Sequence, residues 1–180
     1  MKSCGGVKMD IIKYKSEYEK VFEKEIKPHN FYSKISNNEK KYSYPLDESL
    51  FYYLSPPLNS ESSGKRLKMF VKQNKVKTLY LSYLTLNNKF AEIPEKSFVD
   101  TKRITEFYLD LGIETSDQVE VIPYIIHYNN MGKNGMTKVT MRNQLIRLKK
   151  DDVKLRLTFK VKGFGNFTIN NISRINVGVK

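Results

Sequence analysis

The sequence predicts a mainly β protein, an antiparallel, jelly-roll-like β-sandwich preceded by a helix and an irregular arm. Three observations support this fold class. Apolar residues recur with a period of two over most of residues 65–180, glycines and asparagines separate the runs, and helical periodicity occurs only before residue 28. The 180 residues include 10 Phe and 12 Tyr, which is enough for one domain with a buried core.

The first 64 residues are expected to form a leader and an arm. Residues 1–8 contain Gly-Gly and no periodicity, which is typical of a flexible leader. Residues 9–64 begin with apolar side chains at three- and four-residue steps from Ile11 to Ile26, which predicts an amphipathic helix. Tyrosines, serines and prolines then indicate an irregular arm or linker. Within it, Phe51–Leu54 is apolar enough for a strand or a docking segment.

The β-sandwich domain is expected to occupy residues 65–180. Its clearest strand is Val153–Lys162, where five apolar residues alternate with five polar ones. Because successive side chains of a strand point to opposite faces, this run predicts a half-buried antiparallel strand. The other predicted strands are Arg66–Lys72, Lys77–Leu84, Lys102–Leu111, Gln118–Tyr128, Val139–Leu148 and a final run from Phe167 to Val177.

The net charge of +13 is concentrated near the C-terminus, because residues 137–180 hold 11 basic and two acidic residues. On the strand Val153–Lys162, the basic residues two apart share one face, about 6.5–7 Å from each other. Such a row suits the phosphate groups of a polymer, although a solvated sheet face in a lysine-rich chain is an open alternative. The predicted anion-binding residues are Arg142, Arg147, Lys154, Arg156, Lys160 and Lys162.

Several classes of function lack their sequence signature. The chain has no nucleophile-elbow, zinc-protease, phosphate-loop or dinucleotide-binding motif, so we predict no catalytic residues. One cysteine and two separated histidines predict neither a metal site nor a cofactor. Phe159 and Phe167 lie on the apolar side of their strands, where they are unable to stack on bases, so a nucleic-acid-binding domain is the third function considered, after a glycan-binding domain and a structural module. No apolar run approaches 18 residues, so no membrane span is expected.

Two sequence segments resemble a known family. Pro123–Gly132 and the stretch from Leu155 to Ile172, with Arg156, Gly163 and Gly165, resemble carbohydrate-binding-module-like β-sandwich domains. Such domains accompany enzymes of bacterial cell-surface polysaccharides, including teichoic acid glycosyltransferases. The resemblance implies an aromatic face with planar hydrogen-bonding side chains. The candidate glycan-binding residues are Tyr80, Tyr108, Tyr124, Tyr128, Asn129 and Asn130.

The expected function is a non-catalytic accessory domain that binds, or is targeted to, a bacterial cell-wall glycan. The expected ligand is an anionic, teichoic-acid-like polymer, and the expected location is the bacterial cytoplasm on its membrane-peripheral side. The alternative is a structural module that forms homo-oligomers or docks to an enzyme domain through the Ile11–Ile26 helix and Phe51–Leu54.

Overall fold

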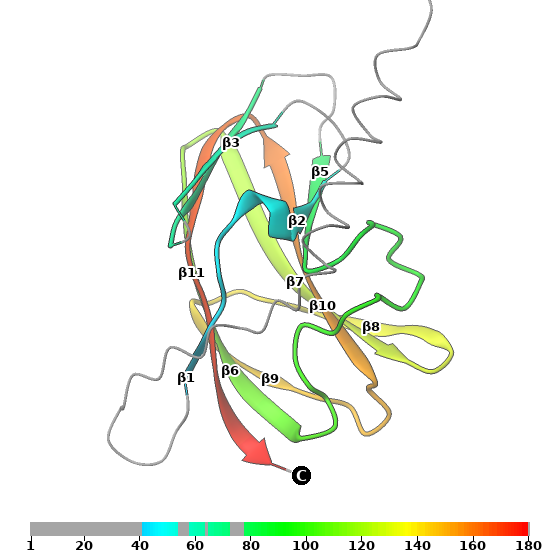
Figure 1. Cartoon of the computed structure of the whole chain (residues 1–180). Coiled ribbons are helices and arrows are strands. Elements are labelled where there is room, and N and C mark those ends of the chain that lie inside the picture. The colour runs from blue at the N-terminus through cyan, green and yellow to red at the C-terminus, as the bar shows by residue number, and fades with distance from the viewer. Residues whose placement is uncertain (1–40, 54–57, 64, 73–77, 180) are drawn as a thin grey trace, which may run out of the picture.

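The structure is a computed structural model that describes residues 41–53, 58–63, 65–72 and 78–179 (Figure 1). The predicted leader and the predicted Ile11–Ile26 helix lie outside these residues and stay predictions. No helix in the described part of the chain is long and apolar enough to cross a membrane.

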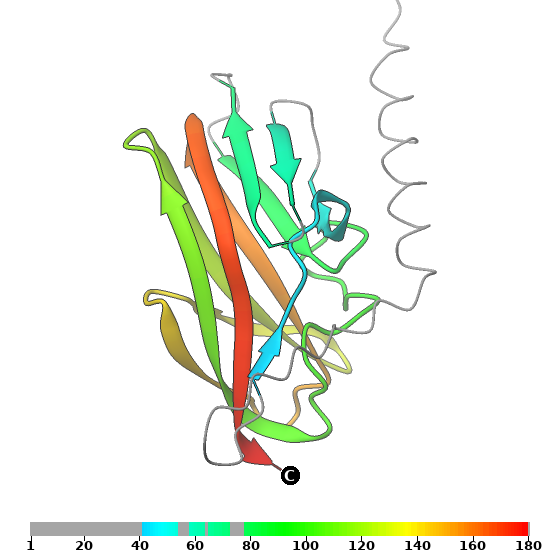
Figure 2. The same cartoon turned by 60° about the vertical axis from the view of Figure 1, so that its left-hand side comes forward.

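Two antiparallel sheets make up the described chain and pack against each other (Figure 2). One is six-stranded, with the order β3-β4-β11-β6-β9 and with β1 paired to β11 on the same side as β4. The other is five-stranded, with the order β2-β5-β10-β7-β8. The strands are β1 Lys41–Ser43, β2 Phe51–Tyr52, β3 Leu58–Ser62, β4 Leu67–Val71, β5 Thr78–Tyr83, β6 Ile104–Thr115, β7 Val119–Asn129, β8 Gly132–Lys138, β9 Asn143–Arg147, β10 Lys154–Gly163 and β11 Gly165–Val179, and a short 3-10 helix spans Glu48–Leu50.

The core lies between the sheets and follows the period-two pattern of the sequence. On β10, Leu155, Leu157, Phe159 and Val161 are buried and face the other sheet. Phe167 of β11 is buried against them, so the expectation that Phe159 and Phe167 are not surface aromatics is confirmed. The prediction of a mainly β, antiparallel chain is confirmed as well.

The strands begin before the boundary expected at residue 65. β1, β2 and β3 come from residues 41–62 and join both sheets. Phe51 is 2% exposed, and its ring lies 4.9 Å from Tyr83 and 6.1 Å from Phe159. Because Phe51 belongs to the core, it is not the docking residue that its apolar neighbours suggested.

The turn between β10 and β11 carries the chain from one sheet to the other. Gly163 has a φ of +81°, and a Cβ at this position would collide with the main-chain oxygen of Gln118. Only Phe164 separates β10 from β11, and the chain changes sheet there rather than closing a hairpin within one sheet.

A long connection, residues 84–103, leads from β5 to β6 and crosses the outer face of the five-stranded sheet (Figure 1). Beyond the end of β5 it takes the place of a strand beside β10, since the Phe98 amide donates to the Leu155 carbonyl at 2.8 Å. We call these residues the β5–β6 connection. The connection divides the outer face of this sheet into two halves.

Candidate functional site

The outer face of the five-stranded sheet gathers more of the predicted site residues than any other surface of the described chain. The strand register places Lys160 of β10 between Tyr80 of β5 and Ile122 of β7. One step along, Thr158 lies between Ser82 and Tyr124. The open half of this face, which the β5–β6 connection leaves uncovered, consists of Thr78, Tyr80, Glu120, Ile122, Tyr124, Met136, Lys138, Lys160 and Lys162. Ile122 is buried among these side chains.

Two tyrosines dominate the open half. Tyr80 and Tyr124 are half-buried, and among the described residues neither hydroxyl has a hydrogen-bond partner. From the strand spacing and the rise per residue, their Cα atoms are about 12 Å apart. The Tyr80 ring meets Phe90 of the connection edge-on, with centroids 5.2 Å apart at 66°. The apolar floor continues to Met136, which is 59% exposed at the outer strand β8.

The open half carries positive charge. Lys160 and Lys138 form no ion pair within the described ranges, and Lys138 stands opposite Tyr124 in the register. Lys162 pairs with Glu120 at 3.1 Å. Two amino groups therefore remain available beside the two tyrosines.

The covered half contradicts part of the predicted basic row. Arg156 is 0% exposed because the β5–β6 connection lies over it. Its guanidinium donates to the carbonyl oxygens of Asn87 at 3.0 Å and Glu92 at 3.5 Å, and burial lowers its pKa. Lys154 Nζ donates to the carbonyls of Pro94 and Glu95, both at 2.7 Å. Lys154, Arg156, Lys160 and Lys162 share one side as predicted, but they do not form a continuous exposed track.

Tyr128 is also placed differently from the expectation. It is fully buried beneath the connection, its hydroxyl donates to the Phe90 carbonyl at 3.0 Å, and burial raises its pKa. A glycan is unable to reach this ring. Tyr108 is 38% exposed but lies on β6 in the other sheet.

The remaining predicted residues lie away from the open half. Arg142 and Arg147 pair with Asp110 and Glu106 of β6, at 3.1 and 3.4 Å, in the six-stranded sheet. Asn129 and Asn130 line a pocket of about 320 Å³ at the β7–β8 turn, together with Met131, Lys150, Asp151, Asp152 and Val153. There the Asn129 amide donates to Asp151 Oδ2 at 3.1 Å.

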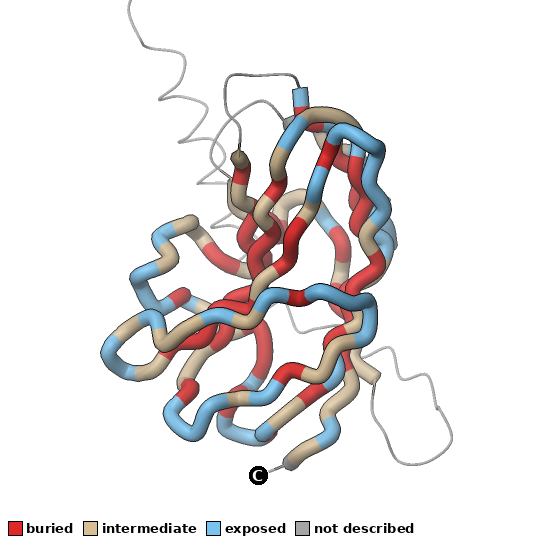
Figure 3. Tube along the Cα trace, turned by 180° about the vertical axis from the view of Figure 1, so that it is seen from behind, coloured by how far each residue is buried: buried red, intermediate tan, exposed pale blue. Residues whose placement is uncertain are grey.

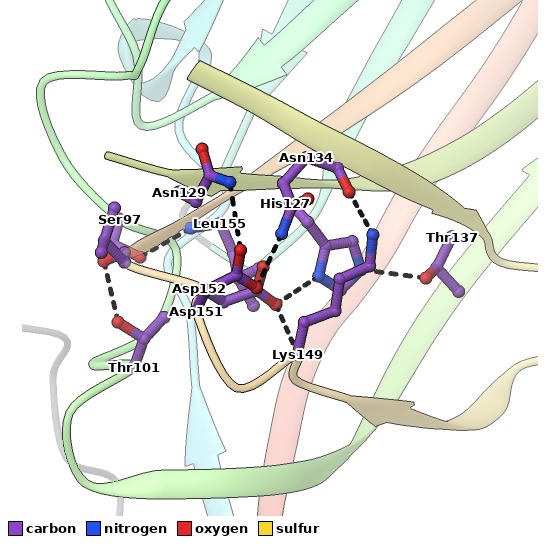
Figure 4. A network of polar contacts seen from close by, with 11 residues as sticks. Ser97, Thr101, His127, Asn129, Asn134, Thr137, Lys149, Asp151, Asp152 and Leu155 are labelled. Carbon is purple, nitrogen blue, oxygen red and sulfur yellow. Dashed lines mark hydrogen bonds and ion pairs between the residues drawn. The ribbon is translucent and has the colours of Figure 1, made fainter. Parts of the chain in front are cut away.

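Figure 4 shows a polar network that the sequence pattern does not predict. His127 Nδ1 lies 2.6 Å from Asp152 Oδ2, and its Nε2 lies 3.0 Å from Thr137 Oγ1. The main-chain N–H of Lys149 also donates to Asp152 Oδ2, at 2.8 Å. His127 and Asp152 are both buried, so the network ties β7 and β8 to the β9–β10 turn. No sequence motif links these residues, since the pair is 25 positions apart.

The described residues hold no group of three or more His, Cys, Asp or Glu side chains able to bind a metal ion. The open half combines two tyrosine rings, an apolar floor and two lysine amino groups.

No protein-family model matches the sequence, and no curated protein matches it. Among solved structures, the chain is similar to the Glycosylation Associate Protein (Gap123) complex from Streptococcus agalactiae, with a TM-score of 0.50 and 13% identity over 76% of this chain and 26% of that one. The chain thus spans about a quarter of the length of that relative. At this identity the likeness shows the fold alone.

Two further solved structures are similar at lower TM-scores. The accessory secretory proteins 1, 2 and 3 of Streptococcus pneumoniae give a TM-score of 0.47 and 16% identity over 67% of this chain and 86% of that one. A low-affinity xylan-binding module from Roseburia intestinalis gives 0.39 and 8% over 80% and 97%.

Proposed function

We propose that this protein is a non-catalytic accessory domain that binds a bacterial cell-surface glycan on the open half of the five-stranded sheet. The observation that carries the proposal is the pairing of Tyr80 and Tyr124 on one face, with Lys160 beside both and their hydroxyls unpartnered within the described chain. Sugar rings present apolar C–H faces and a rim of hydroxyls. A tyrosine matches both, because its ring is apolar and its hydroxyl donates and accepts hydrogen bonds.

The charge of the open half favours an anionic glycan of the teichoic acid type. Lys160 and Lys138 stand beside the tyrosines, so a phosphate between sugar units would meet an amino group where the rings stack. Contacts between exposed charges are screened by salt, and binding should weaken as ionic strength rises. The track is shorter than the sequence predicted, since Arg156 and Lys154 are engaged by the β5–β6 connection.

The fold likeness supports an accessory role. The S. agalactiae structure is a complex of Glycosylation Associate Protein (Gap123). This protein is similar to 26% of the chain that it matches in that structure. We propose that the domain acts beside an enzyme of polysaccharide or glycoconjugate synthesis, in the bacterial cytoplasm on its membrane-peripheral side. The partners are the glycan and the enzyme domain.

The test is retention of the protein on immobilised purified teichoic acid, compared with a neutral polysaccharide and single-stranded DNA, at low and raised salt. Tyr80→Ala and Tyr124→Ala should each weaken teichoic acid binding about tenfold, because truncating a contact tyrosine removes about 1.4 kcal/mol or more. Tyr108→Ala is the matched control, since Tyr108 is an exposed tyrosine on the other sheet.

Two outcomes would contradict the proposal. One is unchanged retention of the Tyr80→Ala/Tyr124→Ala double variant. The other is preferential retention on DNA that depends on the same two tyrosines, which would assign the face to nucleic acid instead.

A further inference from the structure

We infer that Arg156 is a positioning residue, which holds the β5–β6 connection so that Phe90 supports Tyr80 at the edge of the open half. The inference rests on the proposed function for its effect on glycan binding. The placement of the connection rests on contacts of the described residues and is measured without any glycan.

Arg156 holds the β5–β6 connection by two hydrogen bonds to its main chain. Its Nη1 donates to the Asn87 carbonyl at 3.0 Å and its Nη2 to the Glu92 carbonyl at 3.5 Å. These two acceptors flank Phe90 in the sequence, so one side chain fixes the main chain on both sides of that residue. Arg suits this role because its planar guanidinium presents several N–H groups in a fixed geometry.

Contacts run from Arg156 through Phe90 to Tyr80. The guanidinium carbon lies 5.6 Å from the Phe90 ring centroid and 5.6 Å from that of Tyr128. The Phe90 carbonyl accepts the Tyr128 hydroxyl at 3.0 Å, and the Phe90 ring meets Tyr80 at 5.2 Å. The Tyr80 ring is therefore supported by a ring that Arg156 and Tyr128 hold from below.

The burial of the Arg156 guanidinium has a cost in free energy that its hydrogen bonds offset only in part. No carboxylate hydrogen-bonds to it within the described chain, and its Nε is buried without a partner. A guanidinium removed from water is costly unless its hydrogen bonds are well satisfied. An apolar side chain of similar volume would fill the same space at no such cost. The specific consequence of having Arg here is the pair of carbonyl contacts, which fixes where the connection lies.

Other contacts keep the connection attached when Arg156 is replaced. Lys154 Nζ reaches the carbonyls of Pro94 and Glu95, and the Asn88 amide donates to the Tyr80 carbonyl at 3.0 Å. We therefore expect the loss of Arg156 to shift the segment around Phe90 locally and to leave the sheets intact.

The placement is measured by fluorescence. The sequence contains no tryptophan, so Phe90→Trp introduces a single indole at this position. In that background, Arg156→Met should shift the indole emission to longer wavelength and increase quenching by acrylamide at least twofold, and Lys68→Met on the remote strand β4 should do neither. An unchanged emission and quenching in Arg156→Met would overturn the inference.

The role in binding is measured by a double-variant cycle on purified teichoic acid. Arg156→Met should weaken binding about three- to tenfold in the wild-type background, and by less than twofold when Phe90→Ala is already present. Equal factors in both backgrounds would mean that Arg156 acts without Phe90, and would overturn the inference. Arg156→Lys, which keeps the charge but not the planar pair of donors, should behave like Arg156→Met and serves if the latter does not fold.

The two measurements separate this inference from the proposed function. If the indole responds to Arg156→Met but Tyr80→Ala and Tyr124→Ala leave glycan retention unchanged, the proposed function fails and the positioning of Phe90 stands. If the tyrosine variants lose binding while the indole is unaffected by Arg156→Met, the proposed function stands and the positioning of Phe90 by Arg156 fails.

Discussion

Tyr124 and Tyr128 lie four residues apart on the same face of β7, yet their surroundings differ completely. Tyr124 is half-buried with an unpartnered hydroxyl in the described chain, whereas Tyr128 is fully buried and hydrogen-bonded to Phe90. The neighbouring strand β10 repeats the contrast, with Lys160 on the open half and Arg156 sealed beneath the connection. The alternation of a strand assigns a side chain to a face, but a segment from elsewhere decides whether that face meets solvent. Figure 3 shows how far each described residue is buried along the chain.

The two halves also differ in the hydrogen bonding of their polar groups. On the covered half, Arg156, Thr158 and Tyr128 have hydrogen-bond partners inside the molecule. On the open half, the hydroxyls of Tyr80 and Tyr124 and the amino group of Lys160 have none among the residues described. Most buried polar groups in folded proteins are paired, and the covered half follows this rule except at Arg156 Nε.

The largest expected effect tests whether the polar network at the covered end of the sheet is essential to the fold. Asp152→Ala removes the acceptor of both the His127 ring and the Lys149 amide, and leaves these donors buried. We expect a loss of about 3–5 kcal/mol in the free energy of unfolding, which urea titration measures. Asp151→Ala is the matched control, because that neighbouring carboxylate is exposed. Equal destabilisation by the two variants would contradict the role of the network.

The next effect concerns tyrosines that the fold encloses. Burial raises the pKa of Tyr128 on the covered half, and raises that of Tyr83 well above 10. Their stabilising effect is complete below the unfolded pKa of 10 and is lost as pH rises towards the folded value, because the unfolded chain ionises first. Urea midpoints should therefore fall as pH increases above about 10. In Tyr83→Phe the urea midpoint should fall less steeply with pH. A midpoint that falls with pH as steeply as in the wild type would contradict the effect of burial on the pKa of Tyr83.

A smaller effect distinguishes two threonines on the same outer face. Thr158 is buried, and its hydroxyl donates to the Leu81 carbonyl at 2.9 Å and lies 3.2 Å from Ser82 Oγ. Thr158→Val should cost about 1 kcal/mol of unfolding free energy, because a buried hydrogen bond is lost. Thr78→Val, on β5 at the open end, removes no hydrogen bond within the described chain and should change stability by less. Equal costs would mean that the covered and open halves are equally solvated.

The sequence predicted the strands that alternate and missed those that do not. β10 is recognisable because Leu155 to Val161 alternate with polar residues, and the hydrophobic effect requires that pattern of a half-buried strand. β8 escaped prediction because Gly132 and Gly135, both with a φ of +122°, interrupt a polar edge strand that has little apolar pattern. Its place beside β7 is set by tertiary pairing.

The site was predictable as far as the alternation of side chains along each strand defines it. This alternation brings Tyr80, Tyr124 and Lys160 together on one face. The same alternation also placed Arg156 and Tyr128 on that face, and nothing in the local sequence pattern shows that residues 84–103 cover them. The His127–Asp152 contact was equally hidden, since it depends on how the β9–β10 turn folds back against β7.

The smallest expected effect on stability belongs to Lys160, and it tests the open half most directly. Lys160→Gln removes an amino group that has no ion pair in the described residues, so the free energy of unfolding should change by less than about 0.5 kcal/mol. Binding to purified teichoic acid should nevertheless weaken at low salt and approach the wild-type value at high salt, because salt already screens the missing charge there. Lys68→Gln is the matched control, since Lys68 is an exposed lysine without an ion pair in the described chain and lies on β4 of the other sheet, so its loss should leave the salt dependence unchanged. If the two variants show the same salt dependence as wild type, the open half binds its glycan without using charge, and the ligand is neutral.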